Sequence, residues 1–274
     1  MRTQVLEALC DIEARHDVTV LFACESGSRG WGFASPDSDY DVRFIYVNRL
    51  PWYLTVTPGR DVLELPISGE LDVNGWDLRK ALGLMRESNP TLLEWLGSPI
   101  VYREEADTMA QFRALAQQVF SNAKGWHHYA SMAKKNFREH LQADEVRYKK
   151  YLYVLRPLLA ARWIRTQPGV PPMRFAELAQ HTLDAARDAA LIAEINVLLE
   201  VKMRAGEAAT SPRWPGIHAF IETELARNTA EPVQALPVPG NAALDALLHD
   251  TVLCYDAAHA AHAVHAVHAV HHSV

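Results

Sequence analysis

Two aspartates, Asp39 and Asp41, stand one residue apart at the start of the run DYDVRFIYV. This run, residues 39–47, alternates in character and predicts a β-strand. Side chains alternate between the two faces of a strand, so both carboxylates point the same way. Adjacent like charges repel unless a cation lies between them, and carboxylate oxygens suit Mg²⁺. The pair therefore predicts a site for Mg²⁺, with Mn²⁺ as the alternative, while a solvated strand end is the simpler interpretation of the pair alone.

A glycine and a serine precede these aspartates. Residues 18–26, VTVLFACES, form a short apolar run that predicts a buried strand, and Gly27 and Ser28 follow it. Gly27 lets the backbone approach a ligand closely, and Ser28 offers a hydroxyl near the start of a predicted short helix. Such a turn holds a phosphate chain. With residues 29–38 as the connection, the turn and the aspartates together predict a site for a nucleoside triphosphate (NTP) and its metals.

A third carboxylate is expected, because a two-metal phosphoryl-transfer site needs an acid near the attacking group. Asp72 is the choice, since Leu71-Asp72-Val73 lies on another short predicted strand. Asp77 is the second candidate, but it begins a predicted helix, where capping explains an acidic residue. Arg43 is in step with the aspartates, so it either touches a phosphate or forms a structural ion pair.

The patterns along the chain divide it into two parts and a tail. The first part mixes an opening helix at 3–16, short strands at 18–26, 39–47, 62–67 and 70–73, and helices at about 77–87 and from Pro90. Helical patterns then follow one another at 105–121, 123–141, 144–167, 174–185, 187–205 and 214–227. We therefore predict an α+β fold: a domain at 1–105 with a small mixed β-sheet and flanking helices, followed by an all-helical domain at 106–255.

The tail, residues 256–274, is rich in alanine, valine and histidine. Its histidines recur mostly every third residue, a spacing that drifts around a helix and forms no single face. This low complexity favours a frayed or disordered extension over a metal site.

Composition excludes several classes of protein. The chain has 274 residues and a formal charge of −6, which argues against coating nucleic acid through charge alone. No apolar run approaches the roughly 20 residues that cross a bilayer, and the N-terminus has no cleavable apolar segment, so no membrane partner is expected. The three cysteines, Cys10, Cys24 and Cys254, are too scattered for a disulfide framework. Buried, reduced thiols and a cytoplasmic location are the expectation.

A basic stretch lies in the helical part. Residues 124–165 hold ten Lys or Arg against three acids. This stretch is either a solvated helix face or a basic wall that holds triphosphate or a polyanionic acceptor. Lys149, Tyr153 and Arg156, at steps of four and three, share one helical face. We predict that this face contributes to nucleotide binding.

Four blocks in chain order carry a family resemblance: ESGSRGWGFASPDSDYDVRFIYV, GWDLRKAL, NPTLLEWLGSPIVY and YLYVLRPLLAARWI. Together they resemble the DNA polymerase β-like nucleotidyltransferase superfamily, and within it an uncharacterised bacterial branch related to polymerase-β-like proteins associated with RNA repair. The resemblance covers about residues 20–170. It implies that Gly27 and Ser28 grip phosphates, that Asp39 and Asp41 bind metal and that Asp72 is the third acid. Tyr40 departs slightly, because the family usually has an aliphatic residue there.

The resemblance also implies a reaction. The superfamily transfers a nucleoside monophosphate from an NTP to a hydroxyl or similar acceptor and releases pyrophosphate. The acceptor stays open between an RNA end, a protein and a small molecule. The alternative from a different class is a non-catalytic NTP-binding regulator or partner-binding module on the same fold.

Overall fold

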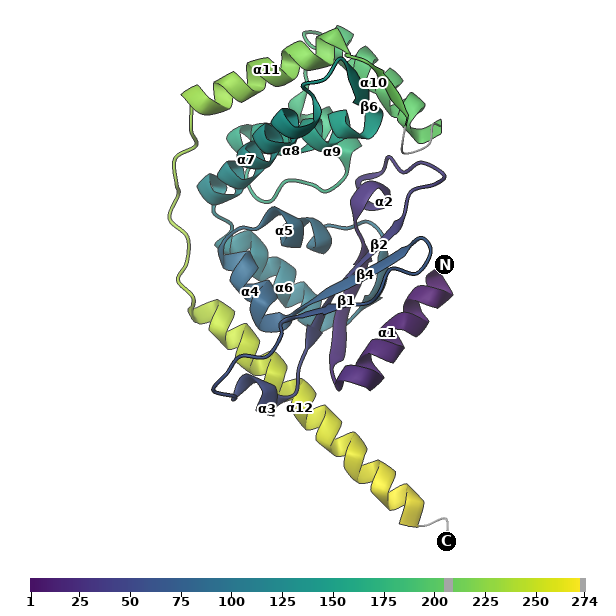
Figure 1. Ribbon diagram of the computed structural model, residues 1–274. Helices are drawn as coiled ribbons and strands as arrows, with labels where there is room; N and C mark the ends of the chain where they lie inside the picture. Colours follow the sequence, from purple (N-terminus) through teal and green to yellow (C-terminus); the bar gives the residue numbers. More distant parts are fainter. Residues whose placement is uncertain (205–208, 272–274) are drawn as a thin grey trace.

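The computed structural model describes residues 1–204 and 209–271, with side chains described at 1–204 and 209–259. A five-stranded sheet with the order β3-β4-β2-β1-β5 lies in its lower half (Figure 1). The strands are β1 (Thr19–Glu25), β2 (Tyr40–Val47), β3 (Val62–Glu64), β4 (Leu71–Asp77) and β5 (Val101–Glu104). β2 and β4 run parallel, whereas the other neighbouring pairs are antiparallel. The sheet is therefore mixed, as the sequence predicted.

Successive side chains of a strand point to opposite faces of the sheet, and both faces are apolar here. On one face, Phe44 and Tyr46 of β2 pack against α1 (Arg2–His16). On the other, Ile45 and Val47 pack with residues of α4 (Leu78–Arg86), α5 (Pro90–Leu96) and α6 (Ala106–Val119). Because side chains two apart in a strand share a face, Asp41 and Arg43 point to the same side as Ile45. The polar start of β2 is thus aimed toward α5, away from α1.

A helical layer lies above the sheet and its helices (Figure 1). It contains α7 (Asn122–His140), α8 (Tyr148–Thr166), α9 (Phe175–Thr182), α10 (Ala189–Arg204) and α11 (Pro215–Ala230). These helices bury a separate apolar core, which Phe33 joins from the loop after α2 (Gly27–Trp31). The loop that follows β1 is therefore held between the sheet and the helical layer.

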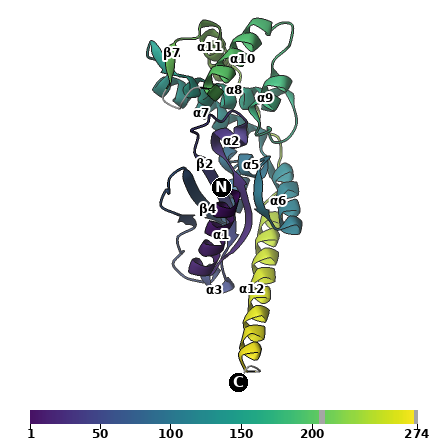
Figure 2. The ribbon, with the colours of Figure 1, turned by 90° about the vertical axis from the view of Figure 1, so that its right-hand side faces the viewer.

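The last helix, α12 (Ala242–His271), returns to the sheet half of the molecule. An extended connection leads down to it from α11, and its far half projects away from the other elements (Figures 1 and 2). Leu244, Leu247 and Val252 are buried in the core that α4 and α6 share. Thus α6 and the start of α12, which follow residue 105, pack in the same core as the sheet. The predicted domain boundaries stay a prediction.

The α+β prediction is confirmed, one strand was not predicted, and three local expectations are corrected. Of the three cysteines that were expected to be buried, Cys10 and Cys254 are exposed. Residues 101–104 form a strand, β5, that pairs with β1. The helix expected from 144 begins at Tyr148, because β6 (Glu145–Arg147) pairs with β7 (Thr210–Pro212). The backbone of the tail continues α12 to His271, where an irregular extension was expected; alanine is the strongest helix former. Residues 272–274 of the predicted tail lie outside the described residues.

The described helices include none that combines the length and the apolar character needed to cross a membrane.

Candidate functional site

Asp41 and Asp72 are partners across the parallel strands β2 and β4. The guanidinium of Arg43 lies between them. Its Nη2 donates to Asp41 Oδ1 at 2.9 Å and to Asp72 Oδ2 at 2.7 Å. Its Nη1 donates to the carbonyl oxygens of Val42 at 3.0 Å and of Asp72 at 3.1 Å. Of the two roles foreseen for Arg43, the structure contains the ion pair, which supplies the cation that neighbouring carboxylates need.

Gly27 lies directly against the Asp41 carboxylate. Its φ is +55°, in the left-handed region that favours glycine. A Cβ at this position would stand 2.0 Å from Asp41 Oδ2. The Asp41 carbonyl also accepts a hydrogen bond from the N–H of Ser26 at 2.8 Å. The turn after β1 and the start of β2 are thus held in contact, and glycine is required where they meet.

Glu25 is a buried carboxylate that the sequence reasoning missed. It is 1% exposed and ends β1. Its Oε1 accepts a hydrogen bond from the Asp41 N–H at 2.8 Å, and its Oε2 accepts one from the hydroxyl of Tyr102. Burial raises the pKa of Glu25, although these two hydrogen bonds act in the opposite direction. The signal in the sequence was an acidic residue ending an otherwise apolar strand.

A cavity of about 380 Å³ opens between this turn and the helical layer. From the sheet half come Gly27, Asp41 and Arg43, and from α8 come Tyr153 and Arg156. The other lining residues are Ser26, Trp31, Thr91, Glu94, Trp95, Met132, Asn136 and Pro157. The structure thus brings two residues of the predicted α8 face to the same space as the predicted phosphate turn and one predicted metal ligand.

Arg156 is the buried cation of this cavity. It is 3% exposed, and its Nη1 donates to Glu94 Oε1 at 2.5 Å. Its Nε donates to the Met173 carbonyl at 3.3 Å, and its guanidinium carbon lies 4.9 Å from the centre of the Trp31 ring. Its Nη2 is buried with no hydrogen-bond partner among the described residues. Because buried donors are almost always paired, this nitrogen is suited to a ligand.

Four predicted site residues lie outside the cavity lining: Asp39, Asp72, Ser28 and Lys149. Asp39 is exposed, just before β2, and its carbonyl accepts a hydrogen bond from Arg29 Nε at 3.1 Å. Ser28 is buried within α2, and Lys149 is half-buried one turn before Tyr153 on α8. The lining instead includes Ser26, the residue that precedes Gly27.

A buried lysine supports the turn before Asp39. Lys202 of α10 is 3% exposed, and its Nζ donates to Ser35 Oγ at 3.0 Å and to Ser38 Oγ at 3.3 Å. Ser35 and Ser38 are also buried, and their hydroxyl oxygens lie 3.0 Å apart. The helical layer therefore fixes the loop that leads into the aspartates, a long-range contact that sequence spacing does not reveal.

Asp77 serves as a helix cap, as the sequence suggested for this second candidate. It lies at the far end of β4 from Asp72. Its Oδ1 accepts a hydrogen bond from the N–H of Arg79 at 2.8 Å, at the start of α4. Its Oδ2 accepts from Tyr53 at 2.7 Å and from Asn48 at 2.8 Å. These contacts explain its burial without a ligand.

The basic stretch of the sequence does not form one wall. Arg156 faces the cavity, whereas Arg162 of the same helix approaches Asp188 at 3.8 Å and Glu224 at 3.6 Å. Arg165 Nη1 lies 4.0 Å from Glu231 Oε2, and Arg165 Nη2 donates to the Glu231 carbonyl. Acids from distant parts of the chain therefore compensate part of the charge that is concentrated in the sequence of α8.

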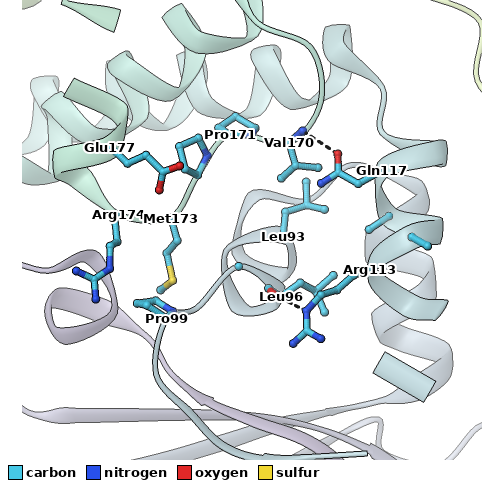
Figure 3. A pocket seen from close by; sticks show the side chains of 14 residues that line it. Leu93, Leu96, Pro99, Arg113, Gln117, Val170, Pro171, Met173, Arg174 and Glu177 are labelled. Atoms are coloured by element: carbon cyan, nitrogen blue, oxygen red, sulfur yellow. Dashed lines mark hydrogen bonds between the residues drawn. The ribbon is translucent and has the colours of Figure 1, made fainter. Parts of the chain in front are cut away.

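A larger cavity, about 610 Å³, lies on the other side of α5 and holds none of the predicted residues. Leu93 and Leu96 of α5 face it together with Val170, Pro171 and Met173 (Figure 3). The neighbouring Glu94 and Trp95 face the smaller cavity instead. The mainly apolar lining of the larger cavity lacks the carboxylates of the candidate site. Size alone therefore does not identify the functional cavity.

The two neighbouring carboxylates of the site have the chemistry that a divalent metal needs, although an arginine lies between them. Asp41 and Asp72 offer the hard oxygen ligands that Mg²⁺ prefers. In the part of the chain whose side chains are described, no three His, Cys, Asp or Glu residues gather closely enough to hold an ion. Arg43 instead bridges the two carboxylates.

The match to a family model agrees with the motifs. Residues 1–250 match the model of a family described as the RNA repair pathway DNA polymerase beta family. Over 254 residues, 92% of this chain and 96% of the other, the sequence is 44% identical to the uncharacterized protein YcgL of Bacillus subtilis (strain 168). A solved nucleotidyltransferase-like protein from Exiguobacterium sibiricum 255-15 is similar at 13% identity and a TM-score of 0.29, over 90% of this chain and 75% of that one. The family match confirms the resemblance seen in the sequence blocks.

Proposed function

Because the chain belongs to the RNA repair pathway DNA polymerase beta family, a family of nucleotidyltransferase type, we propose that it is a metal-dependent nucleotidyltransferase. It moves a nucleoside monophosphate from an NTP to an acceptor hydroxyl and releases pyrophosphate. The observation that carries this proposal is the cavity in which Gly27 and Asp41 meet Tyr153 and Arg156. A triphosphate needs hydrogen-bond donors and a metal, and this cavity has the donors Tyr153 and Arg156 together with Asp41, a carboxylate that would hold the metal.

Asp39, Asp41 and Asp72 are the carboxylates proposed for the metal site, with Mg²⁺ or Mn²⁺ as the ion. When bound, the ion would neutralise phosphate charge and polarise the reacting phosphoryl group. The parallel register of β2 and β4 supports the inclusion of Asp72, since it sets this carboxylate opposite Asp41. Asp72 would also accept the proton of the attacking hydroxyl.

The nucleotide is proposed to lie in the cavity with its phosphates toward the turn at Gly27 and Ser28. The unpartnered Nη2 of Arg156 supports a contact to a phosphate oxygen, because a charged donor binds an anion more strongly than a neutral one. Tyr153 offers a hydroxyl from the previous turn of α8. Lys149 and Arg43 remain proposed nucleotide contacts, at the outer end of α8 and beside Asp41. Catalysis then consists of positioning and charge neutralisation.

The acceptor we propose to test first is an RNA end, because the family is described by an RNA repair pathway. A protein and a small molecule are the other acceptor classes. The experiment measures pyrophosphate release from each of the four NTPs with Mg²⁺ or Mn²⁺, with RNA, DNA or cell extract as the acceptor. A labelled NTP then identifies the product as an extended RNA, a labelled protein or a small adduct.

Asp39→Asn/Asp41→Asn should reduce release by on the order of 10³-fold, since loss of a metal removes several kcal/mol of transition-state stabilisation. Asp11→Asn is the matched control, because Asp11 is exposed on α1 and pairs only with Arg15 among the described residues. NTP binding with no release from any acceptor would support the alternative, a non-catalytic NTP-binding regulator. Absence of NTP binding would overturn both.

A further inference from the structure

Arg43 is held between the carboxylates more firmly than a surface ion pair. Its side chain is 18% exposed, and it makes four hydrogen bonds within the two strands. Two of the acceptors are backbone carbonyls, of Val42 and Asp72, whose positions are fixed by the sheet. A planar guanidinium suits such convergent acceptors, and the bonds to carboxylates are the strong kind. The guanidinium is thus fixed against the neighbouring strands β2 and β4.

The oxygens that Arg43 binds are those that a bridging metal would need. A metal ion between Asp41 and Asp72 would take one oxygen from each, and Nη2 already contacts Asp41 Oδ1 and Asp72 Oδ2. An ion beside the guanidinium would also meet a like charge at short range, in a partly buried place where screening is weak. The two cations therefore compete for one position.

Asp41 has another oxygen on a different side. Its Oδ2 is directed at Gly27, where it would stand 2.0 Å from a Cβ. This is the side of the phosphate turn, and exposed Asp39 lies two residues before Asp41, just before β2. One divalent ion together with Arg43 neutralises the charge of the three carboxylates. A second ion is therefore not needed to balance these three side chains.

We propose that Arg43 is a resident cation that replaces one of the two metal ions of the site. The chain then binds a single divalent ion, with the nucleotide, through Asp39 and Asp41, while Asp72 holds Arg43. This inference rests on the proposed function and narrows its metal site. In this arrangement Arg43 is a positioning residue for both carboxylates.

The experiment counts bound Mn²⁺ by electron paramagnetic resonance. The full chain is titrated with Mn²⁺ alone and with the α,β-methylene analogue of each of the four NTPs in turn. Arg43→Met removes the guanidinium with little change of bulk, and Arg43→Lys keeps its charge. Arg60→Met is the control: it loses the same charge from an arginine that is 71% exposed and pairs with Glu64. Circular dichroism and thermal unfolding check that each variant is folded.

The wild type and Arg60→Met should bind one ion per chain with nucleotide analogue. Arg43→Met should bind two, the second at least tenfold more tightly than any second ion of the wild type. Arg43→Lys should stay near one. Two ions in the wild type would overturn the inference, because a metal would then displace the Arg43 guanidinium from the carboxylates. The proposed function would still stand. One ion in both wild type and Arg43→Met would also overturn it. No ion with any analogue would overturn the proposed metal dependence as well.

Discussion

Gly27 and Asp41 are in contact at the point where the turn after β1 meets β2. A Cβ on Gly27 would stand 2.0 Å from Asp41 Oδ2 and 2.9 Å from the carboxyl carbon. Gly32, five residues on, has a φ of +90°, but a Cβ there would meet no described atom within 4 Å. The two glycines share a left-handed backbone and differ in whether a side chain has room. A substitution at Gly32 therefore strains the backbone alone, whereas the same substitution at Gly27 also displaces the Asp41 carboxylate.

Gly27→Ala should therefore abolish most activity. The methyl group must push the Asp41 carboxylate away, and a misplacement of about 1 Å is enough to cost on the order of 100-fold in rate. The left-handed φ adds roughly 1–2 kcal/mol of strain. Pyrophosphate release and urea unfolding measure the two effects. Gly32→Ala should lose similar stability yet keep nearly full activity, and equal activity losses in both variants would contradict the role given to Gly27.

The buried pair of Arg156 and Glu94 leads to a second prediction. Arg156→Met should lower the free energy of unfolding by about 3–5 kcal/mol, because it leaves the Glu94 carboxylate buried without its cation. Arg156→Met/Glu94→Gln should regain most of that stability, since no uncompensated charge remains. Urea unfolding of the two variants and of Glu94→Gln provides the comparison.

The double variant also tests nucleotide binding. If Arg156 Nη2 contacts the nucleotide, the stable double variant should still need a higher NTP concentration for half-maximal pyrophosphate release, by roughly tenfold for one charged hydrogen bond of 1.5 kcal/mol. A double variant with normal stability and normal NTP dependence would restrict Arg156 to a structural role.

Local patterns were enough to predict the elements around the site. The alternation at 39–47 set Asp41 and Arg43 on one face, and the spacing of Tyr153 and Arg156 set both toward one cavity. These inferences succeeded because the period of a strand or helix is a local property of the backbone. The capping of α4 by Asp77 was predictable for the same reason, since a cap and its helix are adjacent in sequence.

Contacts between distant segments were not predictable in this way. Tyr102 donates a hydrogen bond to Glu25, and Lys202 of α10 donates one to Ser35. Long stretches of chain separate the partners in each pair. The sheet order that sets Asp72 beside Asp41 through Arg43 is likewise a tertiary result. Sequence reasoning placed three acids together and expected a metal to compensate them. An ion pair was one of the two roles expected for Arg43, but the sequence does not reveal that one guanidinium contacts both Asp41 and Asp72.

Asp77 provides a prediction about pH. Burial raises its pKa, although hydrogen bonds from Tyr53, Asn48 and the Arg79 N–H act to lower it. A folded pKa above the unfolded value of about 3.8 means that the folded state binds the proton more tightly. The resulting stabilisation is complete below the unfolded pKa and is lost as the pH rises through the folded pKa.

Asp77→Asn keeps an oxygen that caps α4 but does not titrate. The unfolding free energy of the wild type minus that of the variant should therefore fall as the pH rises from about 4 toward neutrality. Urea unfolding of both proteins at several pH values in this range measures the difference. A difference that stays constant or grows with pH would contradict the raised pKa.

The last prediction concerns the buried lysine beneath the turn that leads to Asp39. Lys202→Met should lower the free energy of unfolding by about 1–3 kcal/mol, because it removes charged hydrogen bonds to two buried hydroxyls. Ser35 and Ser38 can still bond each other, so the turn should loosen without collapsing. Asp39 would then be held less well, and the Mg²⁺ concentration for half-maximal pyrophosphate release should rise several-fold, with little change at saturating Mg²⁺.

Arg204→Met, which removes a charge from an 81% exposed side chain at the end of the same helix, is the control. If Lys202→Met loses stability but keeps the Mg²⁺ dependence of that control, Lys202 supports the fold alone and does not position the aspartate.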